Sequence, residues 1–415
     1  MTRVVHVNSH LSGGAARGAY WLHQALRAAG VDSSFLSRPK EESALAAEAV
    51  PDTLGWQVHQ RVSRRLYRLL RRLKHKDRGG FWSLQLVPNT ISETINEFGA
   101  DLVHLHWVGR EFVPIASVPR IEAPLVWTIR DMWPFTGGCH YSEQCSGYHY
   151  QCGACPQLRG DFSYDLSHLV WRWKKHCWRD LDVHLVAPSE WMADCIRASS
   201  LLRDYPVRVI PNGVSLDTFY PEPAAAARRK LGLPVDGKLV LFGAMNARES
   251  RKGGRQLLEA LERIAQTSKA EDISVVVFGQ GTPLELPLPS VHLGYIDNDE
   301  RLRLAYSAAD VMVVPSLEEA FGKTVIEAMA CQTPVVAFNT GGPADIIAHR
   351  ENGFLAPTGH SERLAEGILW CLEEDERLAR LSEASLETAQ FRYGIRTVAS
   401  EYTELYEEIL SRRGG

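Results

Sequence analysis

Several features that would assign this chain to other protein classes are missing from its sequence. No run approaches the roughly 18 consecutive apolar residues that a membrane-spanning helix requires. The net charge is only −4, so the overall balance gives no reason to expect nucleic acid as a partner. The first apolar run, TRVVHVNSH, starts at residue 2 and leaves no room for a signal peptide, so we expect a cytosolic protein.

Signals for a nicotinamide, a flavin or a catalytic metal are missing as well. A dinucleotide fold needs an acidic residue at the end of its second strand to hold a ribose, and here that predicted strand ends in SSFLSR. No DxD metal motif follows a predicted strand. We therefore expect no cofactor in catalysis. In a cytosolic chain, the eight cysteines are expected to be reduced thiols or metal ligands rather than disulfides.

What the sequence does contain is a regular alternation of short β-type runs and amphipathic stretches, which is typical of a doubly wound α/β protein. A segment rich in Pro and Gly, 211–237, separates two such sets and is predicted to be a linker, and the tail from 361 to 412 is predicted to be helical. We therefore expect two similar α/β lobes with a cleft between them. The predicted strands are 3–8, 33–37, 101–106, 124–129, 183–187 and 206–210 in the first half, and 238–243, 273–278, 290–294, 311–315 and 334–338 in the second.

Glycine-rich and basic loops follow several predicted strands. Gly13 and Gly14 precede a helix, where backbone N–H groups would favour an anion, although a simple tight turn has the same sequence. The loop NARESRKGG carries Arg248, Arg251 and Lys252, which would suit a diphosphate or form a solvated basic loop. VVVFGQGTP and VHLGYIDNDERL place glycines where a flat base could approach the backbone, as ordinary turns also do.

The segment SLEEAFGKTVIEAMA, 316–330, carries Glu319 in a predicted loop and Glu327 on the helix that follows. A carboxylate can accept hydrogen bonds from two hydroxyl groups at once, so this pair could hold two polyols. Gly322, Lys323 and Thr324 lie between them at the helix N-terminus, where free N–H groups favour phosphate. Together these groups predict a nucleotide-sugar site, although an E-x7-E pair taken alone is usually surface charge.

This run resembles the E-x7-E donor signature of retaining glycosyltransferases of family 4, which have the GT-B fold of two Rossmann-like lobes. SRKGG, LGYIDNDERL, AADVMVVPS and TGGPADIIAHRENGFL extend the resemblance in the second half, and APSEWMADCI and VIPNGVSLDTFYP do so in the first. The resemblance implies an acceptor-side lobe, 1–215, with a cysteine-rich insert, 137–160. It also implies a donor-binding lobe, 216–390, and a C-terminal helix, 391–415, that returns to the first lobe.

The resemblance assigns roles to individual residues. Glu319 would contact hydroxyls of the donor sugar and Glu327 those of the ribose. The amides of Lys323 and Thr324 would meet the diphosphate, and Lys252 would neutralise it. The expected donor-binding residues are Gly14, Arg248, Arg251, Lys252, Gly279, Tyr295, Phe321, Gly322, Lys323, Thr324 and Glu327.

Two positions near these residues depart from the family pattern. Relatives often carry an Arg five positions before Lys252, whereas this chain has Ala247, so Arg248 or Arg251 must take that role. The family sequence Glu-Gly-Phe-Gly is Glu-Ala-Phe-Gly here, which is a minor change.

A third departure concerns the expected reaction centre. In LVWTIRDMWPFTGGCHY, 125–141, Arg130 stands where many relatives carry a His close to the transferred sugar. Arg130 would bind a donor carboxylate, as in a uronic acid, or alternatively pair with Asp131 or fill space. His104 and His106 end a strand, where an imidazole would handle protons or simply pack. The catalytic candidates are Glu319, Arg130 and His106.

A cluster of cysteines follows the same strand. Cys139, Cys145, Cys152 and Cys155 are spaced C-x5-C-x6-C-x2-C in a Gly-rich segment, a spacing that can close a tetrahedral structural zinc site. An iron–sulfur cluster and unligated thiols are the alternatives, and two histidines are substitute ligands. The histidines are His140 and His149, and the cysteines expected to be packing residues are Cys177, Cys195, Cys331 and Cys371.

The segment RVSRRLYRLLRRLKHKDR, 61–78, combines nine Lys or Arg with leucines at helical spacing. This pattern predicts an interfacial helix on anionic lipid, or alternatively a core-packed helix with a solvated basic face. By the resemblance, the acceptor is a glycan or a lipid-linked glycan. A protein at the cytosolic face of the inner membrane would fit such an acceptor.

These observations predict a retaining glycosyltransferase that moves a sugar from a nucleotide donor, taken as a UDP-sugar, to a hydroxyl acceptor. Its chemistry would be metal-independent and its place would be surface polysaccharide or glycoconjugate biosynthesis. A nucleotide-sugar epimerase is disfavoured because it does not share the E-x7-E helix context. The remaining alternative is a catalytically degenerate protein that holds nucleotide sugar or glycan without turnover.

Overall fold

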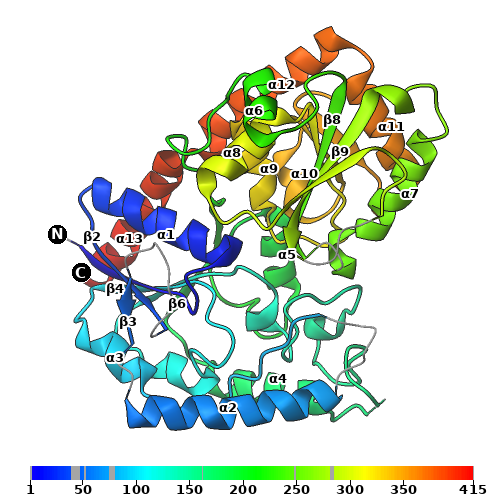
Figure 1. Cartoon of the computed structure of the whole chain (residues 1–415). Helices are drawn as coiled ribbons and strands as arrows, with labels where there is room; N and C mark the ends of the chain where they lie inside the picture. The colour runs from blue at the N-terminus through cyan, green and yellow to red at the C-terminus, as the bar shows by residue number, and fades with distance from the viewer. Residues whose placement is uncertain are drawn as a thin grey trace. The chain divides into compact units, whose positions relative to one another are not determined.

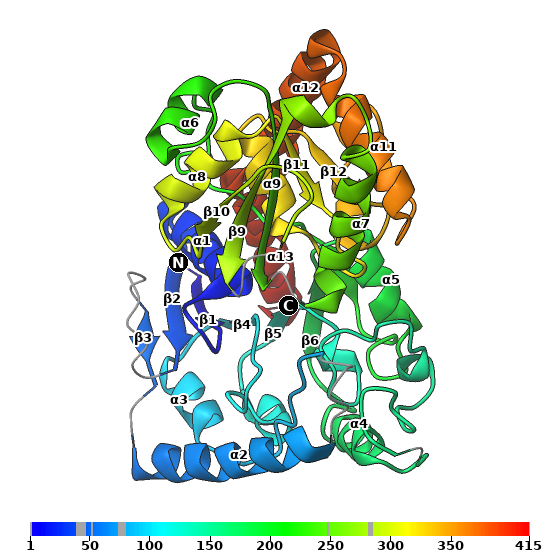
Figure 2. The same cartoon turned by 45° about the vertical axis from the view of Figure 1, so that its right-hand side comes forward.

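The structure separates into two compact units, each built on its own parallel sheet (Figures 1 and 2). The computed structural model describes residues 2–38, 47–50, 53–73, 80–160, 162–246, 249–280 and 285–414. The first unit comprises Met1–Pro211 and Val398–Gly415, and the second comprises Asn212–Thr397. The corresponding divisions predicted from the sequence are 215/216 and 390/391.

The strands of the first unit follow the order β3-β2-β1-β4-β5-β6-β7, and all neighbouring pairs are parallel. The order reverses between β1 and β4, where open α/β sheets bind ligands beyond the strand ends. The strands are β1 (Arg3–Val7), β2 (Asp32–Ser37), β3 (Glu48–Ala49), β4 (Leu102–Leu105), β5 (Leu125–Thr128), β6 (Val183–Ala187) and β7 (Val207–Val209). The helices are α1 (Gly13–Ala28), α2 (Leu54–Leu73), α3 (Ile91–Glu97), α4 (Leu166–Cys177), α5 (Glu190–Ala198) and, from Val398 onward, α13 (Ile395–Gly414).

The second unit repeats the same plan with the strand order β10-β9-β8-β11-β12-β13, again entirely parallel. Its order reverses between β8 and β11. The strands are β8 (Lys238–Asn246), β9 (Ile273–Gln280), β10 (Ser290–Gly294), β11 (Val311–Val314), β12 (Val335–Phe338) and β13 (Gly353–Ala356). The helices are α6 (Ala224–Leu231), α7 (Gly254–Ile264), α8 (Asp299–Ala308), α9 (Lys323–Ala330), α10 (Gly341–Ile346), α11 (Ser361–Leu372) and α12 (Asp375–Tyr393).

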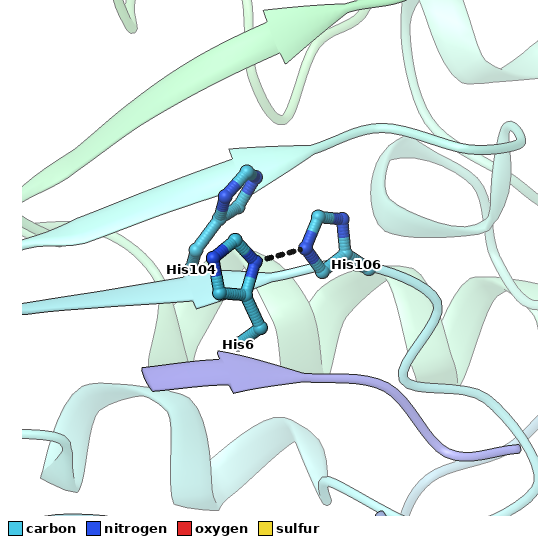
Figure 3. A group of neighbouring side chains, drawn as sticks. All are labelled: His6, His104 and His106. Carbon is cyan, nitrogen blue, oxygen red and sulfur yellow. Dashed lines mark hydrogen bonds between the residues drawn. The ribbon is translucent and has the colours of Figure 1, made fainter. Parts of the chain in front are cut away.

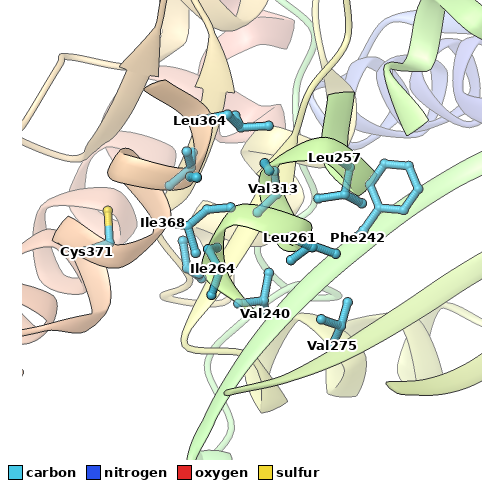
Figure 4. Packing of buried hydrophobic residues seen from close by; sticks show 14 of the residues in the cluster. Val240, Phe242, Leu257, Leu261, Ile264, Val275, Val313, Leu364, Ile368 and Cys371 are labelled. Atoms are coloured by element: carbon cyan, nitrogen blue, oxygen red, sulfur yellow. The ribbon is translucent and has the colours of Figure 1, made fainter. Parts of the chain in front are cut away.

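The core on one face of the second sheet shows why these segments fold as they do (Figure 4). β-Branched strand residues meet helical residues that recur every three or four positions, so each helix turns one apolar face toward the sheet. Cys371 is one of these buried residues, as expected for a packing cysteine. The residues labelled in the figure come from the strands (Val240, Phe242, Val275, Val313), from α7 (Leu257, Leu261, Ile264) and from α11 (Leu364, Ile368, Cys371).

Each of the eleven predicted strands corresponds to a strand of the structure, and the tail from 361 is helical as predicted. Strands β3 and β13 were not predicted. The two residues of β3 are too few to give a periodic signal, and β13 follows a turn in which Arg350 adopts a φ of 67°. None of the described helices has the length and apolar content of a membrane-spanning segment.

The segment 211–237 is not only a linker, as the sequence suggested, because it folds against the second unit. Helix α6 forms within it and ends at Gly232, whose φ of 68° suits a helix C-terminus. The buried Arg228 pairs with Asp310 at 2.7 Å and also donates to the carbonyl oxygen of Ala308. These contacts make the segment part of the folded unit.

Candidate functional site

The candidate donor site lies where two loops of the second unit leave adjacent parallel strands. The loop after β8 contains a short 3-10 turn, Ser250–Lys252, and the loop after β11 leads to α9. Gly253 has a φ of 69°, and a Cβ atom at this position would lie 1.8 Å from the carbonyl oxygen of Pro315. Only glycine allows the two loops to approach this closely.

Glu319 lies in the β11–α9 loop and is held by two cations from the β8–α7 loop. Lys252 Nζ lies 2.5 Å from Glu319 Oε2, and Arg251 Nη1 lies 3.4 Å from the same oxygen. Burial alone would raise the pKa of the Glu319 carboxyl, but Lys252 and Arg251 lower that pKa to about 2. Of the two arginines predicted to take part, Arg251 therefore contacts the proposed donor carboxylate, while Arg248 lies outside the described residues.

A pair of glycines at the start of α10 supports this loop from the other side. The amide of Gly342 donates to the carbonyl oxygen of Glu319 at 2.9 Å. A Cβ atom on Gly341 would lie 2.1 Å from that carbonyl oxygen, and one on Gly342 would lie 2.2 Å from Phe321 Cα. Phe321 itself is buried and packs against Tyr393, with ring centroids 5.9 Å apart. Phe321 therefore anchors the loop through its ring.

Helix α9 starts directly after this loop, as the sequence predicted. Gly322 precedes it with a φ of 93°, and Lys323 and Thr324 are its first two residues, whose amides have no acceptor within the helix. Glu327 lies on the second turn and is only 2% exposed. Tyr306 donates to Glu327 Oε2 at 2.9 Å, and Lys323 Nζ lies 3.4 Å from Glu327 Oε1.

The remaining donor-binding candidates lie at strand and helix ends. Gly279, with a φ of 136°, is next to the last residue of β9, and Tyr295 follows β10 with 47% of its surface exposed. Gly14 is the second residue of α1 in the first unit and follows Gly13, whose φ is 85°.

In the first unit, Arg130 is connected to two buried histidines. Arg130 Nη2 donates to His106 Nδ1 at 3.1 Å. Since a guanidinium cannot accept a hydrogen bond, His106 carries its proton on Nε2, which donates to His6 Nδ1 at 2.8 Å (Figure 3). Burial, then the neighbouring histidine and Arg130, lower the pKa of His106 well below its ordinary value. His106 is therefore neutral near pH 7 and positions Arg130.

The third histidine of this cluster, His104, is tied to α13. Its Nδ1 lies 2.6 Å from the Tyr406 hydroxyl and its Nε2 lies 2.7 Å from Thr128 Oγ1. The nitrogens of His6, His104 and His106 lie within 4.8 Å of one another, a spacing that could hold a metal ion. However, the facing nitrogens of His6 and His106 share a hydrogen bond, and Arg130 adds positive charge beside them. These contacts fit a hydrogen-bonded relay better than a cation site.

Asp131 has partners of its own. Its carboxylate accepts from the Trp107 indole at 2.6 Å and from the Trp133 amide at 2.9 Å, and it pairs with His140 at 2.6 Å. The second ring nitrogen of His140 lies 2.9 Å from Ser83 Oγ. Both nitrogens of His140 are therefore used, which disfavours the alternative that His140 is a metal ligand.

The four clustered cysteines, Cys139, Cys145, Cys152 and Cys155, line one cavity of about 20 Å³. The Gly137 amide donates to Cys152 Sγ at 3.1 Å. Burial raises the pKa of the Cys152 thiol to about 12, although the Gly137 amide acts in the opposite direction. Among the described residues, three ligand atoms within 4.8 Å of one another occur at the histidine cluster and not at these cysteines. The cysteine metal site stays a prediction.

The predicted basic helix is observed as α2, Leu54–Leu73, and residues 74–78 of the predicted segment lie outside the described residues. Leu70 faces inward, being 2% exposed, whereas Val62, Leu69 and Leu73 are exposed. The apolar stripe predicted from the sequence is therefore divided between a buried and an exposed face.

Two residues that support these sites were not singled out from the sequence. Tyr306 anchors Glu327 from α8, and nothing in its local sequence signals a partner 21 positions later. The position of His6 could have been inferred from the sequence, because β1 and β4 are parallel neighbours in which His6 pairs with His104. Apolar strands carrying histidines at matching positions could have indicated this cluster.

Two family models match the chain. Residues 12–218 match the model described as Glycosyltransferase Family 4, and residues 224–388 match the model described as Glycosyl transferases group 1. D-inositol 3-phosphate glycosyltransferase of Xylanimonas cellulosilytica is 37% identical over 227 residues, which are 50% of this chain and 52% of that protein. The chain thus spans about half the length of the curated relatives it matches.

Solved structures share the fold over nearly the whole chain. Sucrose-phosphate synthase of Thermosynechococcus elongatus has a TM-score of 0.70 at 20% identity, covering 99% of this chain and 100% of that one. Anabaena HepE in complex with UDP and glucose has a TM-score of 0.68 at 18% identity, covering 98% and 100%. These likenesses show a GT-B fold. Taken with the two family models, they show that the chain belongs to the group 1, family 4 glycosyltransferases.

Proposed function

We propose that this chain is a retaining glycosyltransferase that moves a sugar from a UDP-sugar to a hydroxyl group of a glycan or lipid-linked glycan in the cytosol. Membership of a glycosyltransferase family supports the reaction class. The complexes of HepE with UDP and glucose and with UDP-glucose support UDP as the nucleotide. A role in surface polysaccharide or glycoconjugate biosynthesis is proposed from the family resemblance of the sequence.

The observation that carries this proposal is the ion pair between Glu319 and Lys252 beside the start of α9. In the free protein, Lys252 and Arg251 neutralise the Glu319 carboxylate. A diphosphate bound at the amides of Lys323 and Thr324 would compete for these cations. Glu319 would then accept hydrogen bonds from hydroxyl groups of the donor sugar. The sugar-binding carboxylate and the phosphate-binding cations are therefore paired with each other in the free protein.

The proposed reaction transfers the sugar directly from UDP to the acceptor and needs no protein nucleophile. The bond between the anomeric carbon and the β-phosphate oxygen breaks, and its electron pair leaves with UDP. The acceptor oxygen bonds to the same face of that carbon, and the acceptor proton passes to the departing phosphate oxygen. Lys252 and Arg251 would stabilise the charge that develops on the phosphate, since fixed cations act strongly in a partly buried site.

The test measures UDP release from UDP-sugars in the presence of a hydroxyl acceptor. Glu319→Gln should lower kcat/KM by at least about 100-fold, whereas Glu262→Gln, which changes an exposed carboxylate on α7, should leave it unchanged. Binding of UDP-sugar without UDP release in any donor and acceptor combination would favour the alternative, a binding protein without turnover.

We also propose that the cysteine cavity holds a structural zinc ion. All four thiols line it, the Gly137 amide donates to Cys152, and the amides of Gln157 and Leu158 donate to Cys155. Amide donors aimed at sulfur suit a thiolate, because a thiolate accepts hydrogen bonds that a thiol accepts only weakly. Bound zinc would draw the four sulfurs inward and order this insert.

Metal analysis tests the zinc proposal. The purified chain should contain about one zinc ion, and Cys152→Ser/Cys155→Ser should lose it and unfold at a lower temperature. Cys177→Ser, which removes a thiol of α4 outside the cavity, should retain the metal. A metal-free wild-type chain that is stable in chelator would contradict the proposal.

The exposed face of α2 is proposed to rest on anionic lipid. Val58, Val62, Leu69 and Leu73 form an apolar stripe on this face, and the exposed Arg61, Arg65 and Arg72 lie along one side of it. An apolar stripe bordered by arginine complements a membrane surface of negative charge. This arrangement supports the interfacial reading of the helix over a core-packed helix whose outer face is merely basic.

A further inference from the structure

The first unit contains a cavity of about 470 Å³ that none of the roles above uses. It lies between α2, Arg38 at the end of β2, and the loops that carry Phe81 and Arg110. Its volume is in the range of small-molecule sites, which are about 300–1,000 Å³. Ten described residues line it, four of them arginines and none of them acidic.

Helix α2 contributes one continuous stripe to this cavity. Trp56, Ser63, Arg64, Tyr67 and Arg68 recur at intervals that place them on one side of the helix. This stripe is distinct from the exposed apolar stripe proposed to contact lipid. The same helix therefore presents two surfaces of different chemistry.

The two lining arginines that lie outside α2 are held in place. Arg38 donates to the carbonyl oxygen of Arg110, and the Arg110 guanidinium lies 5.3 Å from the centroid of the Phe81 ring. Arg110 has a φ of 54°, which is uncommon for a residue with a side chain. The neighbouring carboxylate, Glu111, is buried and accepts from the Gln85 amide at 2.5 Å. It is not among the described residues that line the cavity.

Two buried donors in the cavity wall lack a partner. Trp56 Nε1 and Ser63 Oγ have no hydrogen-bond partner in the described part of the chain, although Trp56 is only 2% exposed and Ser63 only 7% exposed. Leaving such a group unsatisfied costs about 1–3 kcal/mol. A ligand with acceptor oxygens would satisfy both donors.

We propose that this cavity binds a phosphate-bearing polyol. Guanidinium groups make charge-assisted hydrogen bonds to phosphate, and the indole and hydroxyl donors suit the oxygens of a polyol. If the glycosyltransferase function proposed above holds, this ligand is the acceptor. The phosphate belongs either to a free sugar phosphate or to a lipid headgroup, and both present the same chemistry to the arginines.

Direct binding to the full chain tests this site without any nucleotide sugar, so the result does not depend on transfer. Calorimetry with glucose 6-phosphate, inorganic phosphate and monomeric dihexanoyl phosphatidylglycerol compares the two possible sources. Arg64→Ala/Arg68→Ala should weaken binding of the preferred probe at least tenfold. The control Arg172→Ala/Arg179→Ala removes the same charge from exposed positions of the first unit that do not line the cavity, and binding should stay within twofold.

A tighter sugar phosphate would identify a soluble ligand, and a tighter phosphatidylglycerol would identify a lipid headgroup. Equal behaviour of the two double variants with every probe would overturn the proposal. Ser63→Ala adds a second readout, because it removes an unsatisfied hydroxyl and should not destabilise the free protein. It should nevertheless weaken the preferred probe about threefold or more, and unchanged binding would contradict the role of this hydroxyl.

Discussion

Glu319 experiences two opposing effects on one carboxyl group. Removal from water disfavours its charge, whereas Lys252 and Arg251 stabilise it, and the cations prevail with a pKa of about 2. The folded-state pKa is thus depressed below the ordinary value of 4.5. The group contributes stability above pH 4.5, and this contribution is lost as the pH falls from 4.5 toward 2.

The lowered pKa of Glu319 gives a prediction for the stability of the second unit. The wild-type chain should gain about 3 kcal/mol from ionised Glu319 at pH 7, and Glu319→Gln should lack this gain. Urea unfolding of both chains at pH 7, 4.5 and 3 measures the difference. The gap between them should shrink below pH 4.5, and a gap that is as wide at pH 3 as at pH 7 would rule out this account.

Arg130 leads to a prediction about donor choice. Its guanidinium donates to a neutral His106, and the planar group has the geometry to match a carboxylate with two parallel hydrogen bonds. The wild-type chain should use UDP-glucuronate at least tenfold better in kcat/KM than UDP-glucose, and Arg130→Met should abolish this preference. Arg120→Met, at an exposed position, serves as the control. A wild-type preference for the neutral donor would refute the carboxylate hypothesis.

At the residue scale, the sequence could indicate Glu319 and Lys252 because each lies in a short local motif. It could not indicate that Tyr306 holds Glu327 or that His6 supports Arg130 through His106, since these contacts join distant segments. The fixed position of Arg130 also could not be predicted, because it depends on a tautomer set by that buried contact.

At the scale of elements, α2 shows why a periodic pattern alone leaves two readings open. Its leucines recur at helical spacing, but the structure buries Leu70 and leaves Leu69 and Leu73 exposed. Neighbouring apolar positions on one helix can thus serve opposite faces. The division depends on what packs against the helix, which is tertiary information.

Vesicle binding tests the outer face of α2. The wild-type chain should sediment with phosphatidylglycerol vesicles and be released by high salt, since screening weakens the attraction of arginine to lipid. Val62→Ser/Leu69→Ser should reduce binding about 30-fold, because each substitution removes roughly 1 kcal/mol of apolar contact. Val235→Ser/Phe391→Ser, which changes exposed apolar residues elsewhere, should not. Equal binding to neutral phosphatidylcholine would contradict the proposal.

The strands could be predicted because parallel strands buried on both faces read as unbroken apolar runs, as VMVV of β11 does. Helix α6 was not predicted from the sequence, because Pro and Gly flank this short alanine-rich helix. Its attachment depends on Arg228 reaching Asp310, 82 positions away. Local composition therefore predicts the strands, but it does not predict contacts between distant segments such as that of Arg228 with Asp310.

At the scale of the whole molecule, the chain completes its first unit with its last residues. Tyr402 and Tyr406 of α13 are buried, and their hydroxyls meet Thr128 and His104 of the first sheet. The first unit is therefore discontinuous in sequence, and the second is an uninterrupted segment. The first unit cannot be complete until the residues of α13 that follow Thr397 have been synthesised.

Truncation separates the two units experimentally. A chain that ends at Thr397 should expose the amides of β4 and β5 to hydrogen exchange about 100-fold faster, because it loses two buried tyrosines. The amides of β8 and β11 should exchange as in the full chain. A chain that ends at Ser411 keeps both tyrosines and is the control. Uniformly faster exchange in both sheets would contradict the prediction that loss of these residues of α13 affects only the first unit.

The glycines at positions 253, 341 and 342 restrict how the proposed donor site can change. At each of them a single added carbon would collide with backbone atoms that cannot move aside cheaply. Directed evolution aimed at these positions should yield misassembled loops rather than altered sugar choice. Libraries should instead vary the exposed Tyr295 and its surroundings, where a new side chain has room and the loops that carry Glu319 keep their shape.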